Sequence, residues 1–138
     1  MAPAIIGALL RQPWFAVGAR VALTSAYWWG GIAKLADFPG AVAEMRHFGL
    51  EPAQVLAALT IAVEIGASIL VILGRGVWLA SGALGVFTVL ATLVAHSFWT
   101  FGDPAERVRE LNIFLEHIGL LGGFVLAAIL AEPARDSR

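Results

Sequence analysis

Polar and ionisable side chains recur at helical spacing within four apolar stretches of the chain. Those that could do chemistry are Arg20, Lys34, Glu64, His96, Asn112, Glu116 and His117. A helix places residues three or four positions apart on one face, and in a bilayer a charged face must turn from lipid toward other helices. A set of basic groups, carboxylates and imidazoles can transfer protons or bind a polar head group. We therefore predict a polar intramembrane site shared by the four stretches.

Arg20 and Glu64 are the two residues that most need a partner, because each lies well inside its apolar stretch. At a rise of 1.5 Å per residue their expected depths differ by about 5 Å, which an arginine side chain can span. A lone charge at that depth is costly, whereas a hydrogen-bonded pair is tolerated. We predict that Arg20 and Glu64 pair. The pair either holds two helices in register or forms a polarised site for a proton or a head group.

His96, Asn112, Glu116 and His117 are expected near one edge of the membrane. Two imidazoles and a carboxylate suit zinc or iron, and two histidines can hold a haem. However, adjacent helical residues such as Glu116 and His117 point about 100° apart, and the His-x-x-x-His and Glu-x-x-His spacings are absent from these helices. A metal ion or a haem is therefore the less favoured interpretation. We favour histidines that bind a carbonyl or head group, or that form a proton path with Glu116.

Composition defines the elements that must position these groups. The chain has 138 residues, of which 59% are hydrophobic and only 14% charged, too few charges to cover a soluble domain. Spans of about 20 residues match a hydrocarbon core about 30 Å thick. We place four spans at residues 14–33, 55–73, 77–95 and 113–130. The prediction is a single all-α transmembrane domain over residues 1–138, a four-helix bundle of up-down-up-down order in the cell (inner) membrane.

The connections carry recognisable turn and cap signals. Gly74 and Gly76 flank a tight turn, which makes the second and third helices neighbours. After Asp37, apolar residues at helical spacing predict a short helix in the membrane interface, between the first two spans. The sequence Asp103-Pro104-Ala105-Glu106 has the cap acceptor and early proline of a helix start. The fourth helix should therefore begin above the membrane.

Charge and cysteine content exclude several functions. A net charge of −1 gives no basic surface for nucleic acid, and membrane lipid is the expected neighbour. Without cysteine, the chain supplies no thiol relay, thiolate metal site or iron–sulfur ligand. Small residues recur every fourth position on the first, second and fourth helices, which lets helices approach closely. They serve either packing inside one bundle, which we favour, or the seam of a homo-oligomer.

Several motifs follow one another along the chain in a defined order. They are Arg20, the run Gly30–Lys34, Glu64, Gly74, His96 and the segment Phe114–Gly123. This order resembles the DoxX family of small membrane proteins, and the last segment resembles one bacterial branch of it. The resemblance covers the whole chain, and Arg20, Lys34, Glu64 and His96 match the family pattern. Family members include a subunit of thiosulfate:quinone oxidoreductase and proteins linked to membrane redox complexes, while many have no assigned role.

The resemblance and the buried acid–base set together favour a redox-associated subunit. In this hypothesis a quinone or similar molecule binds in the polar interior, Arg20 and Lys34 polarise an oxygen, and Glu64 or His96 moves protons. A partner redox subunit is implied, and no self-contained catalytic motif makes the chain an enzyme by itself. Two alternatives remain. One is a non-catalytic assembly or anchoring subunit of a membrane complex; the other, least favoured without a clear inverted repeat, is a proton-coupled carrier or pore.

Overall fold

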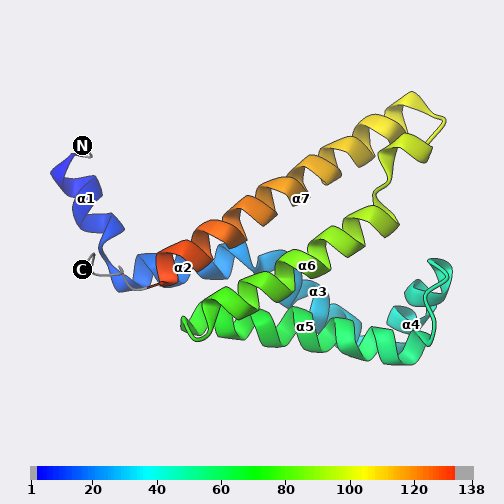
Figure 1. Ribbon diagram of the computed structural model, residues 1–138, viewed down its shortest axis with the longest axis horizontal. Helices are drawn as coiled ribbons and strands as arrows, with labels where there is room; N and C mark the ends of the chain where they lie inside the picture. Colours follow the sequence, from blue (N-terminus) through cyan, green and yellow to red (C-terminus); the bar gives the residue numbers. More distant parts are fainter. Residues whose placement is uncertain (1–2, 133–138) are drawn as a thin grey trace, which may run out of the picture.

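A computed structural model of the chain describes residues 3–132. Within that range the fold is all helical, which confirms the predicted class (Figure 1). The helices are α1 (Ala4–Leu10), α2 (Pro13–Leu23), α3 (Ser25–Ala36), α4 (Phe38–His47), α5 (Ala53–Leu73), α6 (Val77–Ala95), the 3-10 helix η1 (Phe98–Thr100) and α7 (Pro104–Ala131). Helices α5, α6 and α7 lie in the segments that are long and apolar enough to cross a membrane. They account for three of the four predicted spans.

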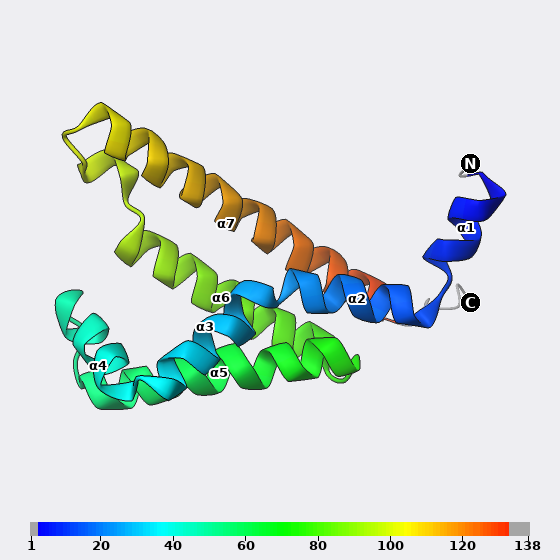
Figure 2. The same cartoon turned by 180° about the vertical axis from the view of Figure 1, so that it is seen from behind.

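The first predicted span, residues 14–33, is not one helix. It is divided at Thr24 into α2 and α3, which run in different directions (Figure 2). The fully buried Thr24 hydroxyl donates to the carbonyl of Arg20 at 2.8 Å. Such a bond from threonine to the preceding turn competes with the helical ladder and bends helices. The prediction of a continuous helix was wrong because a single threonine in an apolar run gives no strong break signal.

Helices α5 and α6 form a hairpin, as the glycine turn predicts. Gly74 and Gly76 both adopt left-handed backbone conformations, with φ of 71° and 56°. Glycine reaches this region without steric cost, so the chain reverses within a few residues (Figure 1). Helix α7 then returns alongside α6 (Figure 1). Its start is also as predicted, because the Asp103 carboxylate accepts from the backbone N–H of Glu106 at 2.9 Å.

Helix α3 packs against α5 through a very close approach at Gly31. A Cβ placed on Gly31 would lie 2.7 Å from Cγ1 of Ile65, closer than real side chains pack. Around this contact a core joins four helices: Tyr27 from α3, Ala67 and Val71 from α5, Leu84 from α6 and Phe124 from α7. Helix α4 packs separately on the first turns of α5. The α3–α5 contact thus sets the position of every residue on α3.

Gly31→Ala is expected to destabilise the protein, whereas Gly66→Ala is not. An added methyl group at Gly31 overlaps Ile65, while a Cβ at Gly66 meets nothing within 4 Å. Overpacking costs about 1–3 kcal/mol, and alanine in an open helical position gains up to about 1 kcal/mol over glycine. The measurement is the thermal unfolding midpoint of both variants in nanodiscs. Equal midpoints for the two variants would contradict the close α3–α5 contact.

Candidate intramembrane site

A half-open cavity of about 540 Å³ lies between α3, α4, α5, α6 and α7. This volume is within the range of small-molecule sites. Its polar lining consists of Tyr27, Lys34, Glu44, Thr60, Glu64, Thr88, His96 and His117. Most other lining residues are apolar, among them Leu56, Phe87, Leu90 and Val94. The cavity therefore combines an apolar surface with a few fixed polar groups, and four of the seven residues predicted for the polar site line it.

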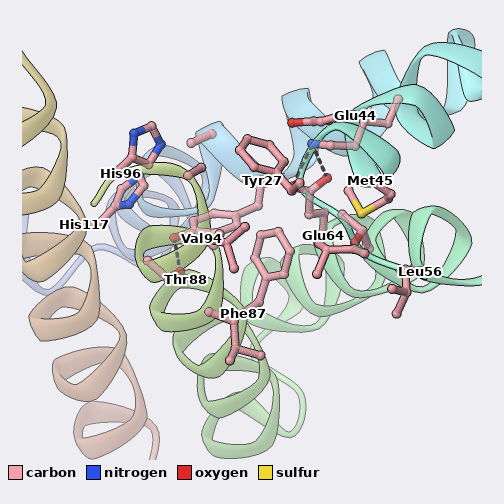
Figure 3. A pocket seen from close by; sticks show the side chains of 18 of the residues that line it. Tyr27, Glu44, Met45, Leu56, Glu64, Phe87, Thr88, Val94, His96 and His117 are labelled. Atoms are coloured by element: carbon pink, nitrogen blue, oxygen red, sulfur yellow. Dashed lines mark hydrogen bonds and ion pairs between the residues drawn. The ribbon is translucent and has the colours of Figure 1, made fainter. Parts of the chain in front are cut away.

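One side of the cavity carries an ion pair between Lys34 and Glu64. The Lys34 Nζ atom lies 3.1 Å from Oε1 and 3.2 Å from Oε2 of Glu64, as the dashed lines at Glu64 in Figure 3 show. The Glu64 side chain is only 5% exposed and that of Lys34 21%. Burial strengthens the attraction but also makes either charge costly without the other. Lys34 stands in the last turn of α3, where the helix dipole also favours a cation.

A tyrosine connects this side of the cavity to α6. The Tyr27 hydroxyl oxygen lies 2.6 Å from the Thr88 hydroxyl oxygen, and the tyrosine ring is almost completely buried. The Thr88 hydroxyl also lies 2.6 Å from the Leu84 carbonyl, which can only accept a hydrogen bond. Thr88 therefore donates to Leu84, and Tyr27 donates to Thr88. This bond links α3 to α6 at the lining of the cavity.

The other side of the cavity carries two histidines in edge-to-face contact. The ring centroids of His96 and His117 are 5.1 Å apart, and Figure 3 shows them together, away from Glu64 and Tyr27. His96 Nδ1 lies 2.8 Å from a carboxylate oxygen of Glu110, whose other oxygen accepts from Arg109 at 3.1 Å. His117 Nδ1 lies 2.6 Å from the Thr92 hydroxyl oxygen. Both imidazoles are therefore held at Nδ1.

The predicted pairing of Arg20 with Glu64 is wrong, because Lys34 takes the place of Arg20. A Cβ placed on Gly74 would lie 2.6 Å from an Arg20 guanidinium nitrogen, so Arg20 reaches the end of α5. Glu64 is ten residues earlier on α5, about 15 Å along the helix. The division at Thr24 is the cause, since it assigns Arg20 to α2 and Lys34 to α3, and α3 is the helix packed along the middle of α5. Arg20 does not line the cavity.

Asn112 and Glu116 are not part of the cavity either, since both are exposed on α7. The carboxylate that binds a histidine here is Glu110, which contacts His96 and has a side chain only 8% exposed. Helical spacing contains a signal for it: Glu110 precedes His117 by seven residues, two turns of a helix, so the two share a face. Lys34, Glu64, His96 and His117 are thus brought to one cavity. Tyr27 also lines it, and Glu110 lies outside the lining but contacts His96. Among residues 3–132, no three side chains of the metal-ligating types lie together as an ion would need.

Comparison with known proteins gives two matches. The family model described as DoxX matches residues 15–97. The inner membrane protein YphA of Escherichia coli (strain K12) is 25% identical over 116 residues, which cover 84% of this chain and 82% of that protein. No solved structure matches the chain. Together with the three helices long enough to cross a bilayer, these matches confirm the predicted location, a multi-pass protein of the inner membrane.

Proposed function

The chain belongs to the DoxX family of membrane proteins, and on that premise we propose that its cavity binds a quinone or a similar lipophilic molecule with a polar head group. The observation that carries the proposal is the two-sided cavity, with Lys34 and Glu64 on one side and His96 and His117 on the other. The apolar lining between them suits a ring and tail. Bound there, the molecule would link the chain to a membrane redox complex as a subunit.

The charges of the lining favour a neutral ligand over an anion. Lys34 offsets Glu64, and Glu44 adds a further carboxylate at the α4 side of the cavity. Two of the three Lys34 N–H groups point to Glu64, which leaves one to donate to a ligand oxygen. A quinone oxygen is a suitable acceptor, because it is polar but uncharged. An anionic ligand would meet net negative charge in an environment of low dielectric constant.

We also propose the membrane arrangement that this site requires. Helices α2 and α3 together cover residues 13–36, about 36 Å at the helical rise, and so complete a fourth crossing with a bend at Thr24. Helix α4 would then lie in the interface and cover the mouth of the cavity with Glu44 and Met45. This arrangement retains the predicted bundle of four crossings in up-down order, with one crossing bent.

Filling the cavity is expected to abolish ligand binding. Ala91 lines the cavity on α6, so Ala91→Phe should reduce the affinity for decylubiquinone at least about tenfold, because the ring occupies the ligand's space. Ala58→Phe is the matched control, since Ala58 is exposed on α5 and does not line the cavity. Affinity is measured by titration of the protein in nanodiscs. Mass spectrometry of protein isolated in native lipid should also detect a bound quinone.

Absence of any co-purified quinone, together with equal decylubiquinone binding by the wild type and Ala91→Phe, would contradict the proposal. An assembly or anchoring subunit is then the better account. The observation that favours this second function is the Lys34–Glu64 pair itself, which joins α3 to α5 and so can serve helix register alone. In that case the ligand should leave the unfolding midpoint unchanged, and Glu64→Gln should weaken the recovery of co-purified subunits.

A further inference from the structure

The protonation of His117 follows from its hydrogen-bonding partner, Thr92. The Thr92 hydroxyl oxygen lies 2.6 Å from the Thr88 backbone carbonyl, a contact that requires a proton between the two oxygens. Thr92 has one hydroxyl proton, so it donates to Thr88 and can only accept from His117. The 2.6 Å contact to His117 is therefore an N–H···O bond from Nδ1. Helix α6 thereby selects the ring form that is protonated on Nδ1.

This assignment leaves Nε2 of His117 as a hydrogen-bond acceptor at the cavity. Within residues 3–132 the ring makes its hydrogen bond through Nδ1, on the side facing α6. Nε2 lies on the opposite side of a ring that lines the cavity. A second proton would create a cation in the membrane beside His96, and neither Thr92 nor any other described partner of the ring is a carboxylate. His117 is therefore neutral, with a lone pair on Nε2.

We propose that the ligand presents a hydroxyl group to Nε2 of His117, so the cavity prefers the reduced, hydroquinone form of a quinone. An oxidised quinone carries only carbonyl oxygens on its ring, and a carbonyl facing an imidazole lone pair gains no hydrogen bond. The hydroquinone hydroxyl supplies the missing donor. On the opposite side, the free N–H of Lys34 can donate to the second hydroxyl oxygen, which also accepts. The inference rests on the proposed function and adds the redox form of the ligand.

His96 strengthens the same preference. Its Nδ1 faces the Glu110 carboxylate, which only accepts, so this nitrogen carries a proton as well. In the neutral ring Nε2 is again the acceptor, and the centroid of this ring lies 5.1 Å from that of His117. The two imidazoles are thus oriented alike, one by a hydroxyl of α6 and the other by a carboxylate of α7. In that ring form His96 gives a ligand hydroxyl a second acceptor on this side of the cavity, whereas a His96 cation paired with Glu110 would leave His117 as the acceptor.

The test compares three ligands of nearly equal size on the full-length protein in nanodiscs, without oxygen. They are a decyl-tailed benzoquinone, its hydroquinone, and the dimethyl ether of that hydroquinone, which keeps the ring oxygens but has no O–H. The hydroquinone is expected to bind at least about tenfold more tightly than the other two. Equal affinities, or tighter binding of the quinone, would overturn the inference while leaving the proposed function intact. If none of the three binds, both are overturned.

Thr92→Val supplies a second, independent measurement. Valine has nearly the same shape but cannot accept from Nδ1, so His117 can protonate either nitrogen. The preference for the hydroquinone should then fall to within about threefold, while Thr92→Ser, which keeps the hydroxyl, retains it. Nitrogen-15 shifts of His117 should report Nδ1 protonated in the wild type and Thr92→Ser. Nε2 protonation in the wild-type protein would overturn the inference even if Thr92→Val does not fold.

Discussion

Replacing Lys34 by methionine is expected to destabilise the protein by about 3–5 kcal/mol, because Glu64 then remains as a buried carboxylate without a cation. Glu64 accepts two hydrogen bonds from Lys34, and its side chain is only 5% exposed. Methionine retains most of the lysine stem, so the packing of α3 against α5 changes little. The free energy of unfolding, measured in nanodiscs by denaturant titration, should fall accordingly.

The partner substitution should cost less. After Glu64→Gln the ammonium of Lys34 is unpaired, but its side chain is 21% exposed and can extend toward the membrane surface. In the double variant Lys34→Met with Glu64→Gln no charge is left behind, and much of the lost stability should return. A nearly neutral Lys34→Met would contradict a buried pair.

Arg20→Met is the matched control for a cation in the first predicted span. Arg20 reaches Gly74 rather than Glu64. Its loss should therefore leave the coupling free energy between Lys34→Met and Glu64→Gln unchanged. If Arg20→Met is instead the variant that Glu64→Gln rescues, the pairing predicted from depth alone was correct. This comparison tests the arrangement of α2 and α3 directly.

The lengths of the apolar runs and the glycines of the turn were sufficient to predict α5 and α6, the two helices that flank Gly74. The predicted third span coincides with α6, and α5 starts only two residues before the predicted second span, because glycines at a tight turn and an unbroken apolar run leave few alternatives. The bend at Thr24 depends on a hydroxyl that bonds to the carbonyl of Arg20 and packs fully buried. Only the burial of Thr24 is tertiary information, because the hydroxyl bond is local and also occurs at Ser68, Thr88 and Thr92 in the undivided helices α5 and α6. The expected depth of a residue in the membrane could therefore not decide whether Arg20 or Lys34 pairs with Glu64.

The histidine side of the site illustrates a different limit. His96 and His117 were identified from their place in apolar helices, but the carboxylate partner was sought beside His117 rather than two turns away. Glu110 lies near the start of α7, in its more polar part, where a glutamate gives no reason to expect burial. It is buried because α7 extends above α6 and turns this residue onto His96. The seven-residue spacing places Glu110 on the same face of α7 as His117. Only the packing of α6 on α7 brings Glu110 into contact with His96.

Glu110→Gln is expected to reduce the affinity for decylubiquinol about tenfold, the largest effect that we expect from a residue outside the cavity lining. The Glu110 carboxylate accepts from His96 Nδ1 at 2.8 Å and holds Arg109 at 3.1 Å. A neutral amide weakens both bonds and can present its NH₂ group to His96, which would force the other ring form and replace the Nε2 lone pair at the cavity by an N–H. His96 would then no longer accept a ligand hydroxyl.

Glu116→Gln is the control, because Glu116 is on the same helix but exposed, and it should leave the affinity within about twofold of wild type. The two variants change charge equally, so a general electrostatic effect would lower both affinities together. A His96 ring that keeps its nitrogen-15 shifts in Glu110→Gln would show that the carboxylate does not orient it. A larger loss of affinity in Glu116→Gln than in Glu110→Gln would instead support Glu116 as the carboxylate of the proton path, as first predicted. That result would require α7 to be rotated about its axis relative to α6.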